Sequence, residues 1–169
     1  DRLVGSEMCI RDRPNLLELG VSDSGLTMLD VTQNKKLRKL WAINNQLTII
    51  DVTKNTDLVE LYLRANQLTS LDVVNNTELV RLQAPDNKMT AIDVTNNPLL
   101  ERLYLYENQL KSIDITRNPL LKIVWLETNL LTEIDLSNNP KIDNLALGNN
   151  PLTSIDAVSY THLRAHETV

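Results

Sequence analysis

Apolar side chains recur along this chain with a period of 21 residues. Residues 100–110 read LERLYLYENQL, and the pattern LxxLxLxxNxL returns 21 residues earlier and 21 residues later. In the centre of the pattern, every second residue is apolar, and this two-residue period is that of a β-strand. Units counted from the Leu of Leu-Thr begin at Leu26, Leu47, Leu68, Met89, Leu110, Leu131 and Leu152, after a partial unit at 14–25. The pattern therefore predicts an array of one short repeated unit.

Each unit has two apolar halves that predict which side chains face inward. In the first half Leu47, Ile50 and Val52 point in and Asp51 points out. In the second half the inward triplets are Leu37, Leu40, Ala42; Leu58, Leu61, Leu63; Leu79, Leu82, Ala84; Leu100, Leu103, Leu105; Leu121, Val124, Leu126; and Ile142, Leu145, Leu147. One unit cannot bury this surface alone, but stacked units cover one another.

The predicted fold is a curved solenoid of about seven coils with a parallel β-sheet along one face. With strands about 4.8 Å apart, the rod is roughly 30 Å long. A 21-residue unit leaves little room for a helix, so we expect extended or short 3₁₀ segments on the opposite face. A helical array needs apolar spacing of i, i+3, i+4 and i+7, and sandwich strands would not repeat at one fixed interval, so both alternatives fail.

Two series of asparagines mark the predicted turns. They are Asn34, Asn55, Asn76, Asn97, Asn118 and Asn139, and Asn45, Asn66, Asn87, Asn108, Asn129 and Asn150. Because an amide both donates and accepts hydrogen bonds, a stacked series can satisfy backbone groups at each corner. We interpret both series as structural, with a glycan at the Asn-x-Ser/Thr matches as the alternative.

The two ends of the chain do not continue the repeat. Residues 3–12 read LVGSEMCIRD and residues 158–168 read VSYTHLRAHET. They resemble translations of the two complementary strands of one transposase-type sequencing adapter. We therefore expect residues 1–13 and 157–169 to be non-native, and residues 14–156 to be a repeat domain cut from a longer protein without its caps. The alternative is a native basic arm and a native His-containing tail.

The consensus sequence of the repeat resembles that of a known protein family. The form LTxIDVTxNPxLxxLxLxxNQ resembles leucine-rich repeat proteins, and it is similar to bacterial surface repeats of the cysteine-ladder internalin type, which are also common in Bacteroidetes. Those repeats often carry Cys where this chain has Ala42, Leu63, Ala84, Leu105, Leu126 and Leu147. The resemblance implies a horseshoe-shaped solenoid, a secreted or cell-surface location in a bacterium, and a partner on the concave face.

The outward strand positions form three columns on the predicted concave face. The columns are Lys39, Glu60, Arg81, Arg102, Ile123, Asn144; Trp41, Tyr62, Gln83, Tyr104, Trp125, Ala146; and Ile43, Arg64, Pro85, Tyr106, Glu127, Gly148. Every aromatic residue of 14–156 falls in them and none falls in the predicted core. Interfaces favour Trp, Tyr and Arg. We therefore predict a ligand-binding surface of Trp41, Tyr62, Arg64, Arg81, Arg102, Tyr104, Tyr106, Trp125 and Glu127. The alternative is ring stacking between coils, which stabilises each pair by about 0.2–1 kcal/mol.

An aspartate recurs once per unit on the opposite half of the coil. The series is Asp30, Asp51, Asp72, Asp93, Asp114, Asp135 and Asp156. Repulsion between neighbours costs about 0.9 kcal/mol in water, and a hydrogen bond to a hydroxyl two residues later contributes about 1 kcal/mol. A structural ladder is therefore feasible, whereas calcium needs six or more converging oxygens.

Composition argues against several classes of function. Residues 14–156 contain no His and no Cys, so they offer neither a His-dependent catalytic triad nor a zinc set. The net charge of −5 disfavours nucleic-acid binding, and no apolar run is long enough to span a membrane. We expect no enzymatic activity, no cofactor and no metal. The favoured function is recognition of a protein or glycan; the alternatives are a spacer array, or the recognition arm of a larger enzyme.

Overall fold

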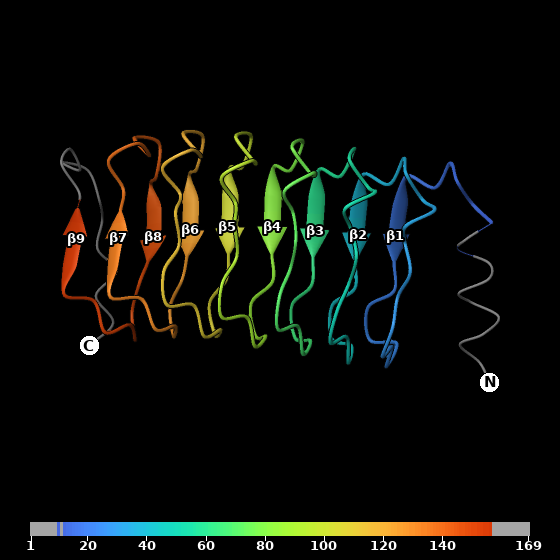
Figure 1. The fold of residues 1–169 in the computed structure, drawn as a ribbon, viewed down its shortest axis with the longest axis horizontal. Coiled ribbons are helices and arrows are strands. Elements are labelled where there is room, and N and C mark those ends of the chain that lie inside the picture. Colours follow the sequence, from blue (N-terminus) through green and yellow to red (C-terminus); the bar gives the residue numbers. More distant parts are fainter. Residues whose placement is uncertain (1–9, 11, 157–169) are drawn as a thin grey trace.

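The structure, a computed structural model, describes residues 10 and 12–156, so most of the adapter-like segments 1–13 and 157–169 lies outside the described residues. In this part of the chain, the three-residue strands stand side by side along the long axis (Figure 1). They are β1 (Glu18–Gly20), β2 (Lys39–Trp41), β3 (Glu60–Tyr62), β4 (Arg81–Gln83), β5 (Arg102–Tyr104), β6 (Ile123–Trp125), β7 (Glu133–Asp135), β8 (Asn144–Ala146) and β9 (Ser154–Asp156).

Seven of these strands form one parallel sheet in the order β1-β2-β3-β4-β5-β6-β8. Equivalent positions of successive coils pair with each other, for example Leu40 with Leu61 and Leu61 with Leu82. A slip of one residue would turn each of these leucines out to solvent, so the apolar pattern fixes the register. The predicted solenoid with a parallel sheet is confirmed.

The core is aliphatic and runs through the whole stack of coils. Leu40, Leu61 and Leu103, at the centres of their strands, are fully buried. The first half of the coil contributes in the same way, with Leu47 and Val52 fully buried. Among the described residues, no aromatic side chain belongs to this core. The aromatic residues are therefore free to serve another purpose.

The asparagine series connect each coil to its neighbours. The Asn108 Oδ1 accepts from the Met89 N–H at 3.0 Å, and its Nδ2 donates to the Ala84 carbonyl at 3.0 Å. Asn97 is fully buried, and its Nδ2 donates to the carbonyls of Val73 and Asn76 in the preceding coil. Both series therefore have structural roles, but only the Asn45 series both donates and accepts as expected: the Oδ1 of Asn97 has no hydrogen-bond partner among the described residues.

The face opposite the seven-stranded sheet has short parallel pairings. β7 pairs with β9, and Asp30 forms an isolated bridge with Asp51. The described residues include no 3₁₀ segment; this face consists of these paired segments, turns and segments without regular secondary structure. The aspartates of this face accept local hydrogen bonds as predicted. Asp93 Oδ1, for example, accepts from the Thr95 N–H at 2.9 Å and from its hydroxyl at 2.7 Å.

Candidate binding surface on the parallel sheet

The first and third residues of each strand point away from the core, because successive side chains of a strand face opposite sides of the sheet. This outward surface of the seven-stranded sheet, hereafter the sheet face, is the one predicted to be concave. It receives Trp41 from β2, Tyr62 from β3, Tyr104 from β5 and Trp125 from β6. Each of these side chains is half-buried, so the rings lie against the sheet and against one another instead of standing free in solvent.

Trp41 and Tyr62 form the first aromatic cluster, hereafter the N-terminal pair. Their ring centroids lie 5.8 Å apart and their planes differ by 10°, so the rings are stacked. The Lys39 Nζ lies 5.9 Å from the Trp41 ring centroid, within cation–π distance. A ring pair of this kind stabilises neighbouring coils by about 0.5–1.5 kcal/mol beyond its area burial.

Tyr104, Tyr106 and Trp125 form the second cluster, hereafter the C-terminal trio. Tyr104 meets Trp125 edge to face, with centroids 5.0 Å apart and planes at 84°. Tyr106 lies 6.3 Å from Trp125 at 51°. The Trp125 Nε1 donates to Asn144 Oδ1 at 2.9 Å, which holds the indole in place. Gln83 occupies the equivalent position on β4, so the predicted aromatic strip consists of two clusters with a polar gap between them.

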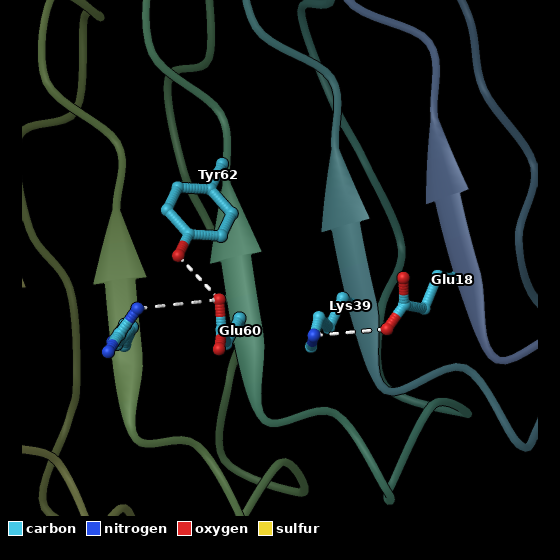
Figure 2. Close-up of polar contacts among 5 residues, drawn as sticks. Glu18, Lys39, Glu60 and Tyr62 are labelled. Atoms are coloured by element: carbon cyan, nitrogen blue, oxygen red, sulfur yellow. Dashed lines mark hydrogen bonds and ion pairs between the residues drawn. The ribbon is translucent and has the colours of Figure 1, made fainter.

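Charged side chains on the first strand position form ion pairs between adjacent strands. Figure 2 shows the Lys39 ammonium beside the Glu18 carboxylate, with Nζ 3.0 Å from Oε1. The same view shows the Tyr62 hydroxyl donating to Glu60 Oε2, at 2.5 Å. Arg81 Nη1 lies 3.8 Å from that Oε2. Burial and the hydrogen bond to Glu60 raise the pKa of Tyr62, and a hydrogen bond with Tyr62 raises the pKa of Arg81. Arg81 is therefore tied to the N-terminal pair.

Three other predicted site residues are not engaged in ion pairs within the described part of the chain. Arg102 pairs in register with Arg81, and Arg64 is exposed just after β3. Glu127 is half-buried beyond β6, and its Oε2 is buried with no hydrogen-bond partner among the described residues. The sheet face thus combines aromatic area with two arginines, Arg64 and Arg102, that form no ion pair within the described part of the chain. Such a surface can bury apolar groups and pair with anions.

Two structural facts bear on other kinds of site. Among residues 10 and 12–156, no group of three or more His, Cys, Asp or Glu side chains is placed to hold a metal ion. The same residues contain no helix of the length and apolarity needed to cross a membrane.

No protein-family model matches the sequence, and no curated protein matches it. Among solved structures, the functional domain of InlJ from Listeria monocytogenes, which includes a cysteine ladder, is 32% identical with a TM-score of 0.67. The match covers 87% of this chain and 38% of that one. The chain is an internalin-like leucine-rich repeat solenoid. The solenoid fills the ladder positions with buried aliphatic residues, such as Ala42 and Leu63.

Two further leucine-rich repeat structures resemble this solenoid. LIC12759 of Leptospira interrogans is 28% identical with a TM-score of 0.81, and the match covers 86% of this chain and 40% of that one. YopM of Yersinia enterocolitica is 26% identical with a TM-score of 0.77, and the match covers 86% of this chain and 31% of that one. The leucine-rich repeat solenoid therefore spans less than half the length of each of these structures.

One feature of the leucine-rich repeat solenoid was not predicted from its sequence. The residue before each asparagine of the Asn45 series, and Asp23 at the equivalent position one coil earlier, has a positive φ near 55°; these residues are Asp23, Asn44, Ala65, Asp86, Glu107, Thr128 and Asn149. Asn and Asp adopt this conformation more readily than other residues with a side chain, so at four of the seven positions the residue type was compatible with a positive φ. Ala65, Glu107 and Thr128 carried none.

Proposed function

We propose that the sheet face binds a protein ligand, as a recognition module of a bacterial surface or secreted protein. The observation that carries this proposal is the placement of every aromatic residue of 14–156 on the sheet face, with none in the core. Aromatic side chains are the largest contributors to core and interface energies. A solenoid whose core is already filled by aliphatic residues does not need them for packing inside the coils.

The arrangement of the rings favours a protein ligand over a glycan. Stacking on a sugar uses an open ring face, and here Trp41 and Tyr62 cover one face of each other while Tyr104 meets Trp125 edge to face, which reduces the ring area open to a sugar. Half-buried aromatic clusters flanked by arginines resemble the centre of a protein interface. The surface location rests on similarity to internalins, and the spacer function is the competing proposal. We propose binding without catalysis.

The proposal is tested by probing arrays of eukaryotic and bacterial ectodomains, and in parallel glycan arrays, with the labelled chain. We expect the wild-type chain to bind at least one arrayed protein and the variant Trp41→Ala/Tyr104→Ala/Trp125→Ala to lose that binding. The control Leu99→Ala/Leu130→Ala removes exposed apolar area from turns instead of the sheet, and it should bind like wild type.

Circular dichroism and thermal melting establish that each variant is folded. Should the triple variant not fold, Trp125→Ala alone makes the same comparison, because Trp125 contacts both other members of its cluster. Protein binding that survives in the folded variant contradicts the proposal. Binding to glycans alone, lost in the variant, would replace the protein ligand with a carbohydrate, and an absence of any binding would favour the spacer.

A further inference from the structure

We propose that the ligand presents an acidic segment, bracketed by apolar side chains, across strands β3, β4 and β5 of the sheet face. This inference rests on the proposed function and specifies the chemistry of the ligand. It is carried by the charge of the sheet face, by the position of Arg81 and Arg102, and by the spacing of the two aromatic clusters.

The sheet face differs in charge from the rest of the molecule. The whole chain has a net charge of −5. The charged residues at outward positions of the sheet face are the cations Lys39, Arg64, Arg81 and Arg102 and the carboxylates Glu18, Glu60 and Glu127. Four cations against three carboxylates make this face weakly positive on an acidic protein. Complementary charge favours an acidic partner and disfavours a basic one.

The positive charge is concentrated at the centre of the sheet. Glu18 pairs with Lys39 at one end. Arg81 and Arg102 occupy paired positions on β4 and β5, so two like charges lie side by side, a destabilising arrangement. Glu60 is the only carboxylate of the described residues within ion-pair distance of either arginine, and it lies 3.8 Å from Arg81. A carboxylate supplied by the ligand would relieve the repulsion at Arg102.

Arg81 and Arg102 are the first residues of β4 and β5, two positions before Gln83 and Tyr104. A ligand that touches both aromatic clusters crosses Gln83 and therefore runs beside the two arginines. A neutral or basic segment would cover Arg102 without pairing its charge, which costs free energy because the guanidinium loses water. An acidic segment pairs with it and can form two parallel hydrogen bonds to the guanidinium. Arg102 therefore selects for acidic ligands as well as attracting them.

The spacing of the clusters sets the length of the segment. Tyr62 and Tyr104 are two strands apart, which is about 10 Å, and Trp41 and Trp125 are four strands apart, about 19 Å. An extended peptide advances about 3.3 Å per residue. Apolar ligand residues on the two clusters are therefore about three to six positions apart, with Asp or Glu between them.

A random nine-residue peptide library displayed on phage tests this inference. The library is selected on the wild-type chain after depletion on the folded aromatic variant Trp41→Ala/Tyr104→Ala/Trp125→Ala. We expect the enriched peptides to carry Asp or Glu between two apolar residues three to six positions apart. Enrichment of neutral or basic peptides overturns the acidic segment but leaves the proposed function standing. Absence of any enrichment over the depleted pool also overturns it, because it shows that the sheet face does not hold a linear segment, while the ectodomain arrays test the proposed function separately.

An enriched peptide is then synthesised with its acidic residues intact and with Asn or Gln in their place. Fluorescence anisotropy should show about tenfold weaker binding, or about 1.4 kcal/mol, for the amide peptide. The variant Arg102→Gln should weaken the acidic peptide by a similar factor and leave the amide peptide unchanged. Arg117→Gln makes the same charge change beside Asp114 on the opposite half of the coil, and it serves as the matched control. Equal affinity of the two peptides for wild type, or equal effects of the two arginine changes, overturns the proposal.

Discussion

Ala65 adopts a left-handed backbone conformation that its side chain disfavours. Its φ is 54°, where a residue with a Cβ costs about 1–2 kcal/mol relative to glycine-like freedom. We predict that Ala65→Gly raises the free energy of unfolding by about 0.5–1 kcal/mol, because removal of the strain exceeds the entropy lost by glycine. Urea denaturation followed by circular dichroism measures the change.

Ala91 provides the matched control for Ala65. It is exposed, and the structure gives it no positive φ. Ala91→Gly should therefore destabilise the chain by about 0.5–1 kcal/mol, since only the entropic cost of glycine remains. Equal destabilisation by the two substitutions would show that the backbone at Ala65 is not strained.

Thr95 donates two hydrogen bonds to the carboxylate of Asp93. Hydrogen bonds from the Thr95 side chain and then its N–H lower the pKa of the Asp93 carboxyl. Because the folded-state pKa is depressed, the stabilisation is present above the unfolded-state pKa and is lost as pH falls through the folded-state pKa. We predict that Thr95→Val raises the pKa of Asp93 toward its ordinary value and removes part of the pH-dependent loss of stability in acid.

Carbon-detected NMR titration of the carboxyl groups measures this effect, with Asp51 as the internal reference. Asp51 keeps its own hydrogen bonds from Thr53, so its pKa should stay below the ordinary value in the variant. The third coil already has Val74 in this place, and there the Asp72 Oδ1 accepts the backbone N–H of Val74. The substitution is thus compatible with the fold, and an unchanged pKa of Asp93 would contradict the assigned cause.

The turn that follows each strand of the seven-stranded sheet, hereafter the main sheet, depends on one buried side-chain amide. We predict that Asn108→Ala lowers the free energy of unfolding by about 2–4 kcal/mol, because the Met89 N–H and the Ala84 and Leu105 carbonyls lose buried partners. Guanidinium denaturation measures the loss. Asn96→Ala, at an exposed turn position, is the control and should change stability by less than about 0.5 kcal/mol.

The strands of the main sheet and the turns were readable from the sequence because each depends on a local rule repeated many times. The apolar alternation around Leu61 decides which side chains are buried, and burial decides the register. The contacts between rings follow no such rule. Tyr62 stacks flat on Trp41, whereas Tyr104 meets Trp125 edge on, although the four residues hold the same position in the repeat. That difference depends on side-chain torsions and on the neighbours of each ring, which the repeat pattern does not specify.

The sequence also left open the conformation of the face opposite the main sheet. Glu133–Asp135 and Ser154–Asp156 pair as strands, while the equivalent segments of the third to fifth full coils have no regular secondary structure. The apolar and polar residues are arranged alike in all of these coils. The pattern of residue types therefore does not distinguish the coils that pair as strands on this face from those that do not.

At the scale of the whole molecule, each strand of the main sheet contacts only the strands of adjacent coils within residues 12–156. The free energy of unfolding of such an array is approximately the sum of the intrinsic stability of each coil and the energy of each interface between neighbouring coils. A weak central coil can therefore uncouple the two halves, whereas a weak terminal coil affects only its own end.

Leu103 and Leu145 allow this consequence to be tested. Leu103 is fully buried in β5 near the middle of the stack, and Leu145 is half-buried in β8 near one end. Leu103→Ala should lower the free energy of unfolding by about 2–5 kcal/mol, and Leu145→Ala should lower it clearly less, because less buried area is lost and the cavity is smaller.

Trp41 and Trp125 lie on opposite sides of the middle of the stack. Variants that retain only one of them (Trp125→Phe or Trp41→Phe) therefore report the unfolding of each half by fluorescence. With Leu103→Ala, the two urea transitions should separate; with Leu145→Ala, only the Trp125 transition should shift. Coincident transitions in both backgrounds would show that the array unfolds as one cooperative unit.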